Sequence, residues 1–280
     1  MDRLHTKLED LKEIIRSYES GSVAFSGGVD STFLLKVARE VLGDRVIAVT
    51  ATSGLFPMRE TDETVDYCKV NGIPQIMFPA EEMKIEGFKE NPVDRCYHCK
   101  RSLFTKIKSI TAEQGLAVVM EGSNVDDDDD YRPGCRAILE LGIQSPLKEA
   151  GLTKAEIREL SKEMGLSTWS KPSFACLASR IPYGEEITQE KLFMIERGEE
   201  ILSDMGFHQY RVRIHMQGLS GQSAPAKIAR IEITPEEFSH LIREDIRTII
   251  DEEFRKIGFQ YVTMDLTGYR MGSMNEMLDQ

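Results

Sequence analysis

The sequence predicts an α/β protein with a doubly wound parallel sheet and a smaller C-terminal α/β domain. Three observations support this fold class. Short, almost wholly apolar runs alternate with helical patterns through the first half of the chain, as in sheets that are buried on both faces. A glycine-rich turn joins the first apolar run to a helical pattern. Beyond Pro182, the helix and strand patterns indicate a separate, smaller unit.

The first half of the chain contains four expected strands and four expected helices. Segment 1–20 is charged and amphipathic, and apolar residues recur at helical spacing over 30–42 before Gly43. Further helices are expected near 59–70 and 99–114. The expected strands lie at 22–25, 45–50, 75–78 and 116–120.

The second half begins with a capping box, Thr153 to Glu156, which opens a helix that ends near Gly165. A helix is expected over 189–205, and another is expected from Thr234, where an N-cap, a proline and a second capping box coincide. The expected strands lie at 210–215, 227–233 and 260–264. We place the domains at 1–168 and 169–280.

Composition limits the classes of function. The chain has 280 residues, 41% of them hydrophobic and 29% charged, as in soluble globular proteins. No run of about 20 apolar residues and no signal-peptide pattern occurs, so we expect a cytoplasmic protein without a membrane partner. The net charge of −12 makes nucleic acid an unlikely partner. Five cysteines, an odd number, argue against a disulfide framework.

The segment Ser26-Gly27-Gly28-Val29-Asp30-Ser31 lies between the first strand and the next helix. Glycines let the backbone approach a ligand, and a helix N-terminus presents unpaired N–H groups and a positive dipole end to an anion. Ser26, Ser31 and Thr32 add hydroxyl donors. A plain turn capped by Asp30 is the alternative, but it leaves the glycines and serines without a role. The sequence therefore predicts a phosphate site.

This hexapeptide resembles the pyrophosphate loop, or PP-loop, of the ATP pyrophosphatases, which have the adenine-nucleotide α-hydrolase fold. The resemblance implies that ATP binds Ser26, Gly27, Gly28, Asp30, Ser31 and Thr32. It also implies that Mg²⁺ binds the phosphates and that Asp30 helps to bind the Mg²⁺, directly or through water. A substrate oxygen would attack the α-phosphate, and pyrophosphate would leave.

A second loop, Glu121 to Asp127, follows the fourth expected strand. Ligands of doubly wound folds bind beyond the carboxyl ends of the strands. We therefore expect the nucleotide to be flanked by residues of this loop and of the loop after the second strand. These residues are Ser53, Gly122, Ser123, Asn124 and Asp126. The rest of the acidic run, Asp128 to Asp130, is interpreted as a solvated loop.

Three cysteines lie in segments that favour chemistry. Cys96 and Cys99 form a CxxC pair before an expected helix. The pair is compatible with zinc, iron–sulfur or redox chemistry, but a thioredoxin-like role is disfavoured, because that motif follows the first strand of a different fold. Cys176 lies in an expected loop with Lys171 and Arg180, whose charges favour a thiolate. The helical pattern around Cys68 indicates core packing, and Cys135 has no assigned role.

Three motifs, CYHCK at 96–100, EGSNVDD at 121–127 and CLASRIPYGEEIT at 176–188, together resemble the LarE family of ATP-dependent sulfur transferases. The family matures the nickel-pincer cofactor of lactate racemase. The resemblance implies that the carboxylates of pyridinium-3,5-biscarboxylic acid mononucleotide are adenylated and that sulfur then displaces AMP. It also implies a homo-oligomer, a hexamer. Arg180, four residues after Cys176, is a candidate to stabilise the adenylate or thioester intermediate.

The resemblance leaves two sulfur sources open. In one kind of family member the cysteine matching Cys176 gives up its own sulfur. In the other kind, cysteines matching Cys96, Cys99 and Cys176 hold a 4Fe-4S cluster whose open iron carries a sulfide. This chain has all three cysteines and resembles the second kind.

Arg211 and Arg213 alternate on an expected strand and therefore share one face. Two guanidinium groups on one face suit a phosphate, and the mononucleotide of the LarE family carries one. The alternative is the solvent face of an edge strand. Two other functions also remain open, a tRNA thiolase of the same superfamily and a non-catalytic nucleotide-binding regulator.

Overall fold

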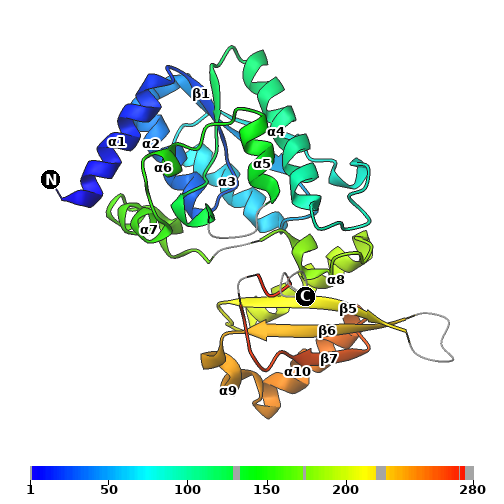
Figure 1. Ribbon diagram of the computed structural model, residues 1–280. Coiled ribbons are helices and arrows are strands. Elements are labelled where there is room, and N and C mark those ends of the chain that lie inside the picture. The colour runs from blue at the N-terminus through cyan, green and yellow to red at the C-terminus, as the bar shows by residue number, and fades with distance from the viewer. Residues whose placement is uncertain (1, 129–132, 173–174, 219–224, 271, 275–280) are drawn as a thin grey trace. The chain divides into compact units, whose positions relative to one another are not determined.

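The computed structural model describes residues 2–128, 133–172, 175–218, 225–270 and 272–274, which fall into two compact units (Figure 1). Unit 1 comprises Met1–Phe88 and Asp94–Phe174. Unit 2 comprises Lys89–Val93 and Ala175–Gln280. Residues 129–130 of the acidic run lie outside the described residues.

The core of unit 1 is a parallel sheet of four strands in the order β3-β2-β1-β4. The strands are β1 Gly21–Ala24, β2 Val46–Thr52, β3 Gln75–Pro79 and β4 Val118–Met120. In register, Gly21 lies opposite Val46 on one side and Val118 on the other. Strands β1 and β2 are mostly buried, which is why their sequences form continuous, largely apolar runs rather than alternating patterns. Strand β3, at the edge of the sheet, is less buried.

Helices cover both faces of this sheet (Figure 1). The helices are α1 Arg3–Ser17, α2 Val29–Leu42, α3 Met58–Val70, α4 Arg95–Glu113, α5 Pro133–Glu140, α6 Pro146–Glu149 and α7 Lys154–Glu163. One core lies between β1 and helices α1, α2 and α7, and it includes Leu11, Phe33 and Ile157. The second core is formed by α4 and α5 against the sheet, and it includes Phe104, Ile107 and Ile138. The short 3-10 turns are η1 Gly43–Arg45, η2 Glu82–Lys84, η3 Val125–Asp128 and η4 Ser167–Ser170. The predicted doubly wound fold is confirmed.

Unit 2 contains a three-stranded sheet in the order β5-β6-β7, antiparallel between β5 and β6 and parallel between β6 and β7. Its strands are β5 Tyr210–Gln217, β6 Ala226–Ile233 and β7 Tyr261–Met264. Its helices and turns are η5 Leu177–Arg180, α8 Gln189–Asp204, η6 Pro235–Glu237, α9 Phe238–Leu241 and α10 Glu244–Ile257. The segment 89–93 joins this unit through Asn91, whose side-chain amide donates to the carbonyl oxygens of Ile181 and Pro182.

Three local expectations were wrong. Helix α4 begins at Arg95, so the CxxC pair lies on its first turns rather than before it. The helix expected from Thr234 starts as the 3-10 turn η6, where the Thr234 hydroxyl donates to Glu237 instead of capping a backbone N–H, and the long helix α10 begins only at Glu244. Helices α5 and α6, each with a proline at its first position, were not predicted.

Candidate functional site

The strand order of unit 1 reverses beside β1. The chain runs outward from β1 to β2 and β3, and β4 then returns to the other side of β1. The crevice beyond the carboxyl ends of two such strands is the usual ligand site of open α/β sheets. Gly122, after β4, packs so closely on the start of α2 that a Cβ atom there would lie 3.1 Å from the backbone nitrogen of Ser31. The predicted phosphate loop and the predicted second loop therefore meet at this point.

The phosphate loop has the conformation that an anion site needs. Gly27 has a φ of +72°, in the region that favours glycine. Gly28 is the N-cap of α2 and brings no side chain to the helix N-terminus. The hydroxyl oxygens of Ser26 and Ser31 are 3.1 Å apart. The Thr32 hydroxyl is buried and has no hydrogen-bond partner among the residues that the structure describes, a costly arrangement that a ligand would relieve.

Asp30 carries the charge of this loop. Its carboxylate forms an ion pair with the Lys154 ammonium, and it accepts a hydrogen bond of 3.4 Å from the Asn124 side chain. Asp126 accepts a hydrogen bond of 2.8 Å from the backbone N–H of Lys154. Asp30, Asn124 and Asp126, predicted from separate segments, therefore belong to one network, and Lys154 links them.

Lys171 holds the other side of the phosphate loop. Its ammonium donates to the carbonyl oxygen of Gly27 at 3.2 Å and forms ion pairs with Glu60, at 2.6 Å, and Glu63. The side chains of Lys171 and Glu60 are almost buried, at 12% and 11% exposed. This lysine fixes the glycine turn to helix α3.

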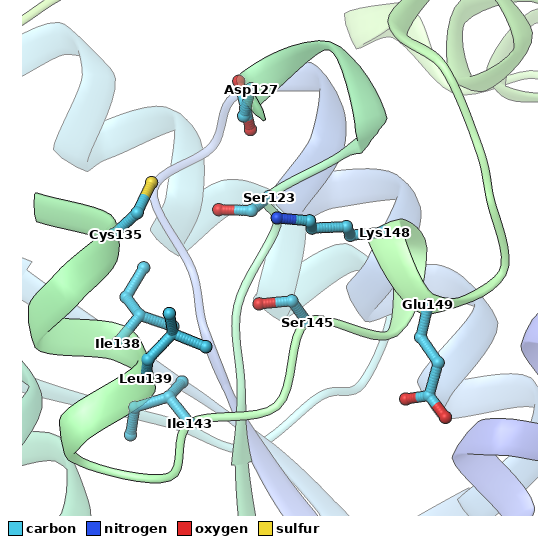
Figure 2. Close-up of a pocket in the computed structure, with 9 residues that line it drawn as sticks. All are labelled: Ser123, Asp127, Cys135, Ile138, Leu139, Ile143, Ser145, Lys148 and Glu149. Atoms are coloured by element: carbon cyan, nitrogen blue, oxygen red, sulfur yellow. The ribbon is translucent and has the colours of Figure 1, made fainter. Parts of the chain in front are cut away.

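A pocket of about 400 Å³ lies beside the second loop (Figure 2). Its polar lining includes Ser123, Ser145 and the thiol of Cys135, and Ile138 and Leu139 contribute to an apolar wall. The buried carboxylate of Glu121 accepts hydrogen bonds from Ser123, at 2.8 Å, and from Ser145. These two bonds fix the loop that carries Ser123.

The cysteines are divided between the units. Cys96 and Cys99 lie three residues apart on α4 in unit 1, and Cys176 is the N-cap of η5 in unit 2. Cys96 is exposed, and the other two are half-buried. The described part of the chain contains no group of three His, Cys, Asp or Glu side chains placed to hold a metal ion. Residues three apart on a helix share one face, so Cys96 and Cys99 fit two ligand positions of an iron–sulfur cluster.

Arg180 fixes the backbone of Cys176. Its Nη1 donates to the carbonyl oxygens of Ala175, at 2.7 Å, and Cys176, at 3.1 Å. Its Nε and Nη2 donate to the two carboxylate oxygens of Glu199, at 2.8 and 3.0 Å. Arg180 is 0% exposed, so the geometry supports a positioning role for it. Direct contact between Arg180 and a reaction intermediate stays a prediction.

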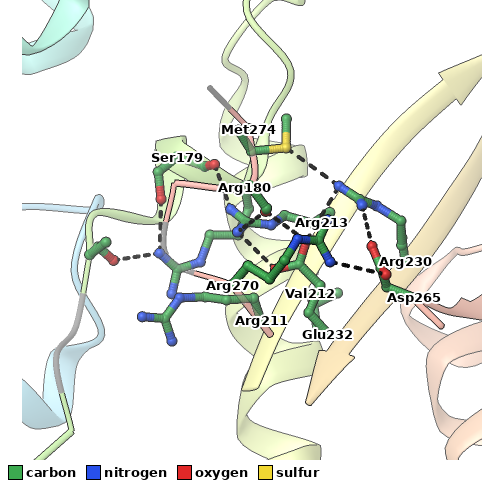
Figure 3. Close-up of polar contacts among 12 residues, drawn as sticks. Ser179, Arg180, Arg211, Val212, Arg213, Arg230, Glu232, Asp265, Arg270 and Met274 are labelled. Carbon is green, nitrogen blue, oxygen red and sulfur yellow. Dashed lines mark hydrogen bonds and ion pairs between the residues drawn. The ribbon is translucent and has the colours of Figure 1, made fainter. Parts of the chain in front are cut away.

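Arg211 and Arg213 lie on β5 and are both buried, so the solvent-face alternative is excluded. Arg213 donates to Glu232 at 2.8 Å and to Ser273 at 2.9 Å, while its Nε is buried without a partner within the described ranges. Burial, and then the charge of Arg180, lower the pKa of Arg211 to about 10. Figure 3 shows Arg180, Arg211 and Arg213 in one set of polar contacts. Such a concentration of buried cations favours an anionic ligand.

The chain has relatives that match it over nearly its whole length. No family model matches it. An uncharacterized protein of Synechocystis sp. is 38% identical over 98% of this chain and 99% of its own length. The pyridinium-3,5-bisthiocarboxylic acid mononucleotide synthase of Lactiplantibacillus plantarum is 34% identical over 99% of this chain and 97% of its own length. The chain belongs to the family of this synthase, the LarE family.

More distant relatives agree with the PP-loop fold of the LarE chain. A glutamine-hydrolyzing GMP synthase chain of Thermoplasma acidophilum is 30% identical over 65% of this chain and 63% of its own length. Among the described residues, no helix has the length and apolar character of a membrane span.

Sequence reasoning missed several residues of this LarE chain that the structure places in the site. Glu199 was not among the predicted site residues, yet it is buried against Arg180. The signal was available, since Leu192, Ile195 and Leu202 repeat at helical spacing on the same face as Glu199. Lys154 was noted only inside a capping box, and no signal in the sequence pairs it with Asp30.

The structure also shows where Ser53 and Cys68 lie. Ser53 follows β2, and its hydroxyl accepts a hydrogen bond from the backbone N–H of Leu55 at 2.9 Å. Cys68 packs in the core, as predicted, and burial raises the pKa of its thiol to about 11.

Proposed function

We propose that the protein is an ATP-dependent sulfur transferase that converts pyridinium-3,5-biscarboxylic acid mononucleotide into its thiocarboxylate, for nickel-pincer cofactor biosynthesis. The observation that carries the proposal is the phosphate loop at the switch point of the sheet, where Gly28 leaves the N-terminus of α2 open and Thr32 lacks a partner among the described residues. The name of the Lactiplantibacillus relative supports the thiocarboxylate product.

The first step joins the two substrates. A carboxylate oxygen attacks the α-phosphorus of ATP, the bond to the bridging oxygen breaks, and pyrophosphate leaves with the acyl adenylate formed. The backbone N–H groups at the start of α2 and the hydroxyls of Ser26, Ser31 and Thr32 bind the phosphates that leave. Mg²⁺ would supply further charge neutralisation when bound, and Asp30 is the carboxylate that we propose would hold it, directly or through water.

The second step replaces oxygen by sulfur. A sulfur nucleophile adds to the carboxyl carbon, and the C–O bond to AMP breaks. Arg180 holds the backbone of Cys176 in place for this step, and Arg211 and Arg213 bind the phosphate of the mononucleotide. Three cysteines on a four-iron cluster leave one iron open, which provides a position for an extra sulfide. The proposed ligands are Cys96, Cys99 and Cys176, in a homo-oligomer.

The first test measures pyrophosphate. Wild-type protein with ATP, Mg²⁺ and the mononucleotide is expected to release pyrophosphate and AMP, and Cys176→Ala is expected to keep ATP–pyrophosphate exchange while forming no thiocarboxylate. Absence of exchange in the wild type would overturn the adenylation step. Loss of exchange in the variant as well would show that Cys176 does more than transfer sulfur.

The second test identifies the sulfur source. After anaerobic reconstitution, we expect about four iron atoms and an iron–sulfur absorbance per wild-type chain, and less of both in Cys96→Ala. Cys135→Ala is the control, because Cys135 is another cysteine of unit 1 but is not a proposed cluster ligand. Mass spectrometry after turnover then decides the source: an intact Cys176 supports the cluster, and loss of the mass of H₂S shows that Cys176 itself was consumed.

A further inference from the structure

Lys154 connects two helix N-termini in unit 1. It is the first residue of α7, and its ammonium pairs with Asp30, the second residue of α2. Its backbone N–H donates to Asp126 of the second loop. All three residues belong to unit 1, so this network is independent of unit 2.

The position is electrostatically unusual for a lysine. A helix N-terminus carries the positive end of the dipole, where cations are disfavoured and anions are stabilised. Lys154 lies in the first turn of its own helix and reaches the first turn of α2. The dipole of α2 and the ammonium group of Lys154 therefore act together on Asp30 and on the crevice beside it, while the N-terminus of α7 binds Asp126. Such a concentration of positive potential fits a ligand of higher negative charge than one carboxylate.

We propose that Lys154 is a nucleotide-binding residue that changes partners: it pairs with Asp30 while the phosphate loop is empty, and it binds the phosphates of ATP when the loop is filled. The inference rests on the proposed function. In the filled state, the Asp30 carboxylate is released toward Mg²⁺. The resting ion pair thus keeps Asp30 from repelling the incoming triphosphate.

The exchange of partners costs little. The side chains of Lys154 and Asp30 are 28% and 20% exposed, so water reaches both charges and can solvate them when the ion pair opens. Asn124 stays on Asp30 through its own hydrogen bond, so the carboxylate keeps one donor when the lysine leaves. The lysine side chain is long and flexible, and a point charge suits several phosphate positions.

The test is equilibrium binding of α,β-methylene ATP, measured by titration calorimetry on the full chain with saturating Mg²⁺ and with EDTA. Lys154→Gln leaves Asp30 unpaired beside the triphosphate, so binding in EDTA is expected to weaken at least about tenfold. The loss is expected to be smaller with Mg²⁺, because the metal ion then neutralises Asp30. Equal affinity of Lys154→Gln and wild type in EDTA would overturn the inference.

Lys7→Gln is the matched control. Lys7 forms an ion pair of 2.7 Å with Glu156, also on α7, at similar exposures of 18% and 25%. Its loss is expected to leave both affinities within about twofold of the wild type, since surface changes away from a site have small effects. A loss in Lys7→Gln as large as in Lys154→Gln would assign the effect to the ion pairs of α7 and overturn the inference.

A second variant covers the case in which Lys154→Gln does not fold. Asp30→Asn removes the resting partner and its negative charge, so Lys154 is available to the phosphates from the start. Binding of the analogue in EDTA is then expected to be tighter than in the wild type, and weaker binding would overturn the inference. If wild-type protein binds no analogue even with Mg²⁺, the proposed function fails, whereas the outcomes above concern Lys154 alone.

Discussion

Arg180 and Glu199 form a buried bidentate ion pair, with Nε and Nη2 of the arginine donating to the two carboxylate oxygens at 2.8 and 3.0 Å. Glu199 also accepts a hydrogen bond of 3.1 Å from the backbone N–H of Val212 on β5. The pair therefore links helix α8, strand β5 and the backbone of Cys176. Because Arg180 is fully buried, its charge depends on this partner.

Glu199→Gln is expected to lower the free energy of unfolding by about 3–5 kcal/mol, because it leaves the buried charge of Arg180 without its counter-ion. The measurement is urea unfolding followed by circular dichroism. Glu200→Gln is the control on the next residue. Glu200 is 37% exposed and pairs with Arg197 on the surface, so its loss is expected to cost about 0.5 kcal/mol or less. Equal effects of the two changes would contradict the importance of burial.

The parallel sheet and the phosphate loop were predictable because their signals are local. Continuous apolar strands arise when a sheet is buried on both faces, and the glycine turn and the helix after it occupy consecutive residues. Helices α5 and α6 were missed although Pro133 and Pro146 stand at their first positions, a signal typical of helix N-termini.

The network of the site was less predictable, because it depends on residues that meet only in space. Lys154 and Asp30 are separated by 124 positions, and either side chain alone fits a capped helix. Glu199 shows the opposite case. Its periodicity with Ile195 and Leu202 places it on the buried face, although a charged side chain is ordinarily exposed.

Cys68 is expected to make the free energy of unfolding fall as the pH becomes alkaline. Burial raises the pKa of this thiol from its ordinary value of 9.0 to about 11, so the folded state keeps the proton that the unfolded state releases. The stabilisation is complete below pH 9 and is lost as the pH rises toward 11. Wild type is therefore expected to lose more unfolding free energy between pH 8.5 and 10.5 than Cys68→Ala, as measured by urea unfolding across roughly this range. Parallel curves for the two proteins would contradict the raised pKa.

Thr32→Val is expected to weaken nucleotide binding without lowering the free energy of unfolding. The Thr32 hydroxyl is buried without a partner among the described residues, so an isosteric valine is expected to leave the unfolding free energy equal or slightly higher. Binding of α,β-methylene ATP is expected to weaken, because a phosphate donor is lost. Calorimetry and urea unfolding measure the two effects.

Thr111→Val is the control for this change. Thr111 is also buried, but its hydroxyl donates to the carbonyl oxygen of Ile107 at 2.7 Å and lies 2.6 Å from the Ser22 hydroxyl. Its loss is expected to cost about 1–3 kcal/mol, because buried partners are left unsatisfied. The nucleotide affinity of Thr111→Val is expected to match that of the wild type. The opposite ranking of the two variants would show that Thr32 has a structural role.

Arg211→Met is expected to remove affinity for the phosphate of the mononucleotide. Burial lowers the pKa of Arg211 to about 10, so the guanidinium is still charged at neutral pH, and its Cζ lies 5.1 Å from the ring centre of Tyr269. A partly desolvated cation is a strong partner for a phosphate, so calorimetry is expected to show at least about tenfold weaker binding. The same compound without its phosphate is expected to bind wild type and variant equally.

Arg255→Met is the control variant, because it changes an exposed arginine paired with Asp251. It is expected to leave both affinities unchanged. Equal losses for the phosphorylated and unphosphorylated compounds would mean that Arg211 supports the shape of the site rather than the phosphate.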